Sequence, residues 1–108
     1  MPHYLIKFSY TPETWAKLIA KPEDRTKAVT KMAEATGGKV VGLWYAFGDC
    51  DGYLLVEAPN NVSAAAESIV AAASGALRSA ETTVLLTSAE MVKAMRKAKG
   101  ISYKPPGG

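Results

Sequence analysis

Residues 3–10 alternate between large apolar or aromatic side chains and a more mixed set. From His3 to Tyr10, one side of the segment would carry Tyr4, Ile6, Phe8 and Tyr10, and the other His3, Leu5, Lys7 and Ser9. Alternation with a period of two is typical of a β-strand whose two faces meet different surroundings. The pattern therefore predicts a first strand with one aromatic, apolar face and one mixed face.

Two helical segments are predicted after this strand. Thr11 can cap a helix beginning at Pro12, and Pro22 should end or kink that helix. Glu23 and Asp24 favour the start of a second helical segment, which Gly37 and Gly38 stop. The apolar residues at helical spacing are Trp15, Leu18 and Ile19 in the first helix and Val29, Met32 and Ala33 in the second.

A β-hairpin is predicted next. Residues 39–47 and 53–58 are rich in β-branched and aromatic side chains, and a short polar connection, residues 48–52, joins them. Asn60 or Asn61 can then cap a helix that runs through Ser74. Its predicted inward stripe consists of Ala66, Ile69, Val70 and Ala73.

The last two elements are a strand and a helix. Residues 79–86 predict the final strand, and Thr87 with Glu90 three residues later forms a capping box for a helix ending near Gly100. Residues 1–100 are expected to form a single domain, and residues 101–108, which end in Pro-Pro-Gly-Gly, are expected to be a flexible tail.

This order of elements predicts an α+β fold. A strand, helix, strand, strand, helix, strand order with right-handed crossovers favours a four-stranded antiparallel sheet in the order 4-1-3-2, with two helices on one face. That is the ferredoxin-like βαββαβ arrangement, here followed by a carboxy-terminal helix.

Strand alternation then divides the sheet into two faces. The residues expected beneath the helices are Tyr4, Ile6, Phe8, Leu54, Val56, Val84 and Leu86. The residues expected on the open face are Leu5, Lys7, Tyr53, Leu55, Glu57, Thr83 and Leu85. The open face is too apolar to leave in water, so we expect a homodimer that pairs two such faces around a small cavity. The alternative is that the carboxy-terminal helix covers this face.

Charge and composition narrow the range of possible binding partners. The chain of 108 residues has a formal charge of +3. Its excess of basic residues lies after Ser88, where there are five basic residues and one acidic residue, Glu90. No aromatic residues interleave these charges, so a solvated helix face is favoured over nucleic-acid binding. The single cysteine fits a reducing compartment, and no apolar run approaches about 20 residues. We therefore expect a soluble, cytoplasmic protein that does not enter a membrane.

Few residues are candidates for catalysis or ligand binding. Lys7 and Glu57, on neighbouring strands of the open face, are the candidate catalytic pair, with a mutual ion pair or solvent exposure as the plainer explanation. The candidate ligand-binding residues are Tyr53, Leu5, Leu55, Asp51 and Arg78. An anion could bind Arg78, although a surface salt bridge would also explain it.

The acidic loop allows two interpretations. Asp49 and Asp51 flank Cys50 and could hold a metal or a substrate hydroxyl, but aspartates also stabilise turns by binding backbone amides. The two carboxylates disfavour a thiolate, so we expect Cys50 to be inert. His3 is the only histidine, and no glycine-rich nucleotide-binding loop occurs. We therefore predict no metal site and no cofactor.

The hairpin carries a family resemblance. The segment G-K-V-V-G-L-W-Y-A-F-G, the strand that ends in E-A-P and the later G-A-L-R-S-A-E-T together resemble the GYD-domain family, grouped with the dimeric α/β-barrel proteins. In one register Gly48 and Asp51 match the family's pattern and Cys50 replaces its tyrosine. In a second register Gly52 and Tyr53 match and Leu54 replaces the aspartate. The resemblance covers about residues 4–95 and implies the fold and a dimer.

Two classes of function remain. The first is a non-enzymatic dimeric module that binds a small, partly apolar molecule or simply assembles. The second is a cofactor-independent isomerase or oxygenase that acts in the cavity between the sheets with Glu57 or Asp51 as its base.

Overall fold

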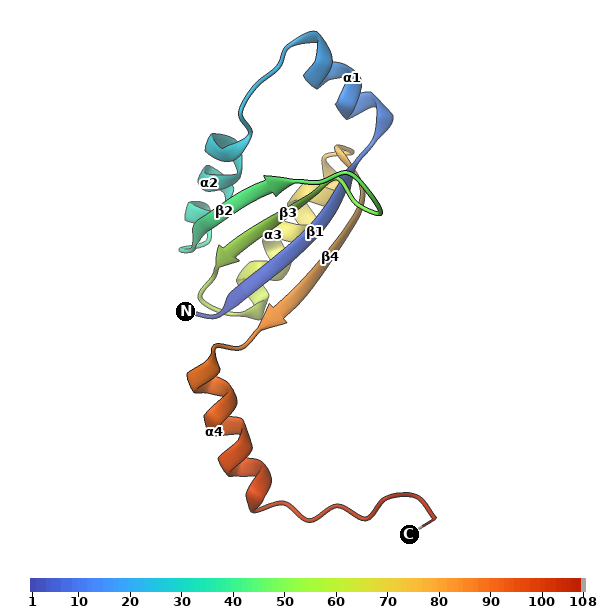
Figure 1. Cartoon of the computed structure of the whole chain (residues 1–108). Coiled ribbons are helices and arrows are strands. Elements are labelled where there is room, and N and C mark those ends of the chain that lie inside the picture. The colour runs from blue at the N-terminus through green and yellow to red at the C-terminus, as the bar shows by residue number, and fades with distance from the viewer. Residues whose placement is uncertain (108) are drawn as a thin grey trace.

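The structure is a computed structural model that describes residues 1–107 and contains eight regular elements (Figure 1). In chain order they are β1 (His3–Tyr10), α1 (Pro12–Ala20), α2 (Thr26–Ala35), β2 (Lys39–Tyr45), β3 (Gly52–Glu57), α3 (Asn61–Ala73), β4 (Leu77–Leu85) and α4 (Ser88–Lys99). Every predicted helix and strand is present, with ends that differ by a few residues from those the sequence predicts.

The four strands form one antiparallel sheet in the order β2-β3-β1-β4. This is the predicted order 4-1-3-2 read from the other edge, so the ferredoxin-like α+β fold is confirmed. Helices α2 and α3 pack on the same face of the sheet, while α1 lies beyond one end of it (Figure 1). Within residues 1–107, no helix covers the other face (Figure 1).

The core lies between the sheet and the helices. Its buried members are Tyr4, Phe8, Tyr10, Leu54, Val56, Ala58 and Ala64. On β1 and β3 these are the residues that alternation assigned to the helix-covered face. A hydrogen bond of 2.6 Å from the Tyr4 hydroxyl to Asn61 Oδ1 ties β1 to the first turn of α3. Asn60 caps the same helix through the backbone N–H of Ser63.

The predicted inward stripe of α3 is wrong. The buried residues of the helix are Ala64 and Glu67, whereas Ile69 is 66% exposed and Val70 is 62% exposed. The helix turns Ala64 and Glu67 toward the sheet and leaves its larger apolar side chains outside. The outer surface of α3 is consequently apolar.

Two residues predicted to lie in the core, Val84 in β4 and Leu86 directly after it, are also exposed. Val84 and Leu86 were expected under the helices, but both are about half exposed. Ser68 Oγ on α3 lies 3.3 Å from Thr82 Oγ1 on β4, and Val84 and Leu86 lie beyond this contact along the chain. Because β4 is an edge strand, no further strand or helix covers its last residues (Figure 1).

Helix α4 extends away from the sheet and gives the molecule an elongated shape of 59 × 34 × 22 Å (Figure 1). Its predicted capping box is present, since the Thr87 side chain accepts from the Glu90 backbone and the Glu90 side chain accepts from the Thr87 backbone. The alternative in which this helix covers the open face of its own sheet is not the arrangement observed.

Replacing Gly52 with alanine is expected to destabilise the fold. A Cβ atom at this buried position would lie 2.5 Å from the Phe8 ring and 2.8 Å from the Trp44 carbonyl oxygen. Overpacking of this kind costs about 1–3 kcal/mol of unfolding free energy, measurable by urea denaturation. Gly100→Ala is the control, because its Cβ would meet only the Lys97 carbonyl oxygen at 3.6 Å. Equal stability of the two variants would contradict the packing argument.

Candidate functional site

The centre of the open face is apolar. Leu5 on β1 lies opposite Leu55 on β3 and Thr83 on β4, and all three side chains point away from the helices. On β2 the Trp44 ring lies over Gly42, where an added Cβ would be 2.3 Å from the indole. Trp44 is also the cross-strand neighbour of Tyr53. The predicted ligand-binding residues Leu5, Leu55 and Tyr53 therefore share one surface.

Lys7 lies at one end of this surface. It is placed between Tyr53 on β3 and Glu81 on β4, and its Nζ lies 2.6 Å from Asp49 Oδ2. This hydrogen bond, reinforced by the charge of Asp49, raises the pKa of Lys7 and lowers the pKa of Asp49. Lys7 is thus held as a cation next to the phenol of Tyr53.

Glu57 lies at the other end of the same face. Its Oε2 is 3.2 Å from Lys39 Nζ, and its Oε1 is 3.5 Å from His3 Nε2. Glu57 is the cross-strand neighbour of His3, four residues before Lys7 on β1, so Lys7 and Glu57 are about 13 Å apart along the strand. The two predicted catalytic residues share a face within one chain but do not contact each other.

Cys50 and Tyr53 are neighbours at the Lys7 end. The Cys50 thiol is buried and lies 3.8 Å from the Gly52 carbonyl oxygen. A hydrogen bond with Cys50 raises the pKa of the Tyr53 phenol. A buried thiol in such contacts is shielded from reagents.

Asp51 holds the structure around the hairpin loop. Its Oδ2 accepts hydrogen bonds from the backbone N–H of Tyr10, at 2.9 Å, and from Trp15 Nε1, at 3.0 Å. The carboxylate therefore connects the end of β1 with α1. Of the two interpretations of the acidic loop, this geometry favours the structural one for Asp51, because one of its carboxylate oxygens already accepts two hydrogen bonds from the protein.

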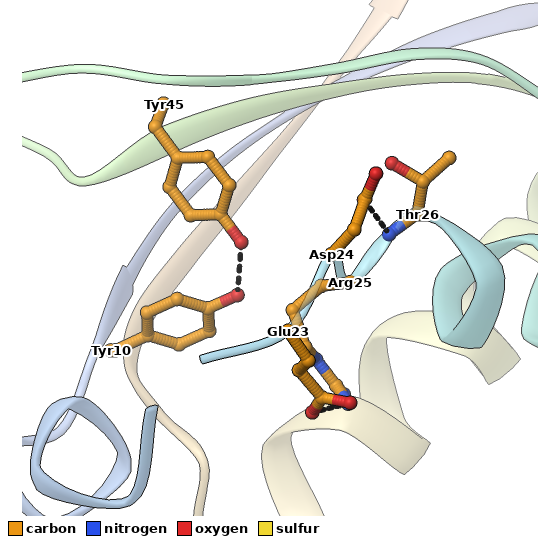
Figure 2. Close-up of polar contacts among 6 residues, drawn as sticks. All are labelled: Tyr10, Glu23, Asp24, Arg25, Thr26 and Tyr45. Carbon is orange, nitrogen blue, oxygen red and sulfur yellow. Dashed lines mark hydrogen bonds and ion pairs between the residues drawn. The ribbon is translucent and has the colours of Figure 1, made fainter. Parts of the chain in front are cut away.

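Sequence reasoning missed an aromatic cluster beside Asp51. Phe8, Tyr10, Trp15 and Tyr45 are packed with ring centroids 5.1–6.3 Å apart. The Tyr10 and Tyr45 hydroxyls are 2.9 Å apart (Figure 2). Burial is the main cause that raises the pKa of Tyr45 far above its usual value, and the hydrogen bond with Tyr10 is the second cause. The alternation of β1 placed Phe8 and Tyr10 together, but no local pattern indicated that Trp15 and Tyr45 would join them.

The segment between α1 and α2 lies across from the two tyrosines. Figure 2 shows Arg25 paired with Glu23, at 3.0 Å, and Asp24 Oδ1 accepting from the Thr26 backbone, at 2.9 Å. The backbone hydrogen bond fixes the start of α2. The pKa of Asp24 is lowered chiefly by a hydrogen bond from the Thr26 side chain and secondly by the one from its backbone N–H. The remaining candidate, Arg78, is exposed on the edge strand β4, and the structure does not bring it to Lys7 or Glu57.

Comparison with protein-family models matches residues 4–95 to the GYD domain. The chain belongs to the GYD-domain family. The match covers the sheet except for His3, the helices α1 to α3 and most of α4. A search of curated proteins found no match. Among residues 1–107, no helix is both long enough and apolar enough to cross a membrane.

The structure bears on the two registers of the family's glycine pattern. Gly52 is buried against Phe8, so close packing explains a glycine there, and the following Tyr53 points onto the open face beside Lys7. Around Gly48 there is open space, and Cys50 in that register is buried. In this GYD-domain protein, only the second register brings a tyrosine to the open face.

Asp51→Ala is expected to lower the unfolding free energy by about 1–3 kcal/mol, because it leaves the Tyr10 N–H and Trp15 Nε1 without their acceptor. Chemical denaturation followed by circular dichroism measures the change. Asp49→Ala is the matched control two residues away, since its exposed ion pair with Lys7 contributes little. If Asp49→Ala were the more damaging substitution, the anchoring role of Asp51 would be refuted.

Proposed function

We propose that this GYD-domain protein is a homodimeric binding module. Two copies pair through the open faces of their sheets and enclose a cavity that takes a small, partly apolar molecule. Leu5, Leu55 and Tyr53 supply the apolar wall of this cavity, and Lys7 and Glu57 supply polar groups at its two ends.

One observation carries the proposal: the apolar centre of the open face is uncovered. Helix α4, which follows the last strand, extends away from the sheet and does not lie across this face (Figure 1). An apolar sheet face of this kind is stabilised by pairing with a second copy, because a two-fold axis brings two identical surfaces together. Membership of a family grouped with dimeric α/β-barrel proteins supports the same arrangement.

The distribution of charge favours binding over catalysis. The positive charge of Lys7 is balanced by Asp49, and Glu57 contacts both Lys39 and His3, so each candidate catalytic group already has partners within its own chain. A catalytic pair would need these two side chains to converge, and in one chain they lie at opposite ends of the face. The polar ends therefore serve best to orient a ligand that the leucines and Tyr53 hold.

Leu55→Asp is expected to convert the dimer to monomers. Two buried carboxylates, one from each copy, would face an apolar interface, which should raise the dimer dissociation constant about a hundredfold or more. Native mass spectrometry and sedimentation velocity of untagged protein measure the subunit number. Ile69→Asp is the control, since it places the same charge on the outer surface of α3. A monomeric unsubstituted protein, or dimers of Leu55→Asp, would refute the proposal.

A second candidate function is a cofactor-independent isomerase or oxygenase. The observation that favours it is the contact between His3 Nε2 and Glu57 Oε1, in which an imidazole adjoins a carboxylate that is mostly buried. In this alternative Glu57 is the general base, and the partner's Lys7 could approach it across the dimer axis.

Glu57→Gln tests the catalytic alternative. Glutamine preserves the shape of the side chain but cannot take a proton, so a catalytic Glu57 predicts that the variant retains substrate where the original protein retains product. The masses of molecules released from both proteins, measured by native mass spectrometry, should then differ. Identical retained molecules with equal occupancy would support a binding module without catalysis.

A further inference from the structure

The chain has a cavity on the opposite side of the sheet from the open face. It has a volume of about 240 Å³ and lies between the sheet and the helices α2 and α3. Its wall is mostly apolar, with Phe8, Leu54 and Val56 from the sheet and Val29 and Met32 from α2. Because the cavity lies within a single chain, it exists whether or not two chains pair.

Glu67 is the unusual member of this wall. It lies on α3 where an apolar residue would be expected, and it is only 5% exposed. Its Oε2 atom is buried and has no hydrogen-bond partner among residues 1–107. Leaving a buried carboxyl oxygen unpaired is costly, and native structures normally satisfy such atoms with protein, water or ligand.

The other polar side chains of the wall already have partners. The hydroxyl of Ser68 donates to the Ala64 carbonyl oxygen, and that of Ser74 donates to the Ala71 carbonyl oxygen. The Tyr10 hydroxyl pairs with Tyr45, and Arg25 pairs with Glu23 (Figure 2). Glu67 is therefore the one polar side chain of this wall whose buried oxygen is left to bind something in the cavity.

We propose that this cavity, which we call the Glu67 cavity, binds a small apolar molecule that carries one hydroxyl group, of the alkylphenol or medium-chain alcohol class. The hydroxyl donates to Glu67 Oε2, and the apolar body packs against Phe8, Leu54, Val56 and the α2 side chains. This site is separate from the cavity between paired sheets and does not depend on it.

Size and polarity select this class. The cavity holds roughly eight water volumes, which suits one ring with a short chain rather than a large cofactor. A single unmatched oxygen calls for one donor. An ammonium group would bring three donors and a full charge into a wall that offers one carboxyl, so its loss of hydration would not be recovered.

The protonation of Glu67 is compatible with a hydroxyl ligand. Burial raises the pKa of the Glu67 carboxyl, while a hydrogen bond from Thr36 opposes this shift. A hydroxyl can donate to the ionised carboxylate and can accept from the neutral acid, so it pairs with Glu67 in either form.

The test uses the full chain and three probes of nearly equal shape: 4-propylphenol, 4-propylanisole and 4-propylbenzylamine. Isothermal titration calorimetry should show that the phenol binds about tenfold more tightly than the anisole, which lacks the donor. Both should bind more tightly than the charged amine. Nuclear Overhauser contacts from the phenol ring to the Leu54 and Val56 methyl groups should place the ligand in this cavity.

Glu67→Leu removes the carboxyl and should reduce the preference for phenol over anisole from about tenfold to about one, while the anisole still binds. Glu34→Leu is the matched control on the exposed surface of α2 and should keep the tenfold preference. The proposal is overturned if the phenol does not bind saturably, if it gives contacts elsewhere, or if Glu67→Leu keeps the preference. Tighter binding of the amine would overturn the hydroxyl assignment.

Discussion

The two unlike faces of β1 are the constraint on which the rest of the structure depends. This strand lies between β3 and β4, so its alternation decides which side chains of both neighbours face the helices. Tyr4 and Phe8 pack in the core, and Leu5 and Lys7 point to the opposite face. A shift of β1 by one residue against both neighbours would exchange these sets and place Lys7 in the core. The fold and the open face are consequences of the same register.

The side of α3 that faces the sheet explains the cavity beneath the helices and its one unpaired polar atom. The helix approaches the sheet through small residues such as Ala64 and places Glu67 inside, while Ile69 remains outside. Small side chains fill little of the space that α2 and α3 enclose, and the result is a cavity with one unmatched polar atom. The same choice leaves an apolar outer surface on α3. A helix of ordinary amphipathic pattern buries its larger apolar side chains, whereas α3 leaves Ile69 exposed.

Three consecutive residues of the hairpin loop have different structural roles. Asp51 stabilises the junction of β1 and α1, Asp49 holds Lys7, and Cys50 is buried beside Tyr53. Residues that looked like one acidic site therefore point to three different surroundings. Their shared function is to join the end of the sheet to α1 and to fix the polar end of the open face, where Tyr53 and Lys7 meet.

The sequence by itself determined the order of the elements, the faces of β1 and β3 and the caps at Thr11 and Thr87, because these depend on residues a few positions apart. Only the tertiary structure decided the partners of Lys7 and Glu57, which strand register separates, and the gathering of Trp15 and Tyr45 around Tyr10. It also decided the inward side of α3. Hydrophobic periodicity predicted the opposite side, because the fit of small residues against a particular sheet depends on a surface that the helix sequence does not contain.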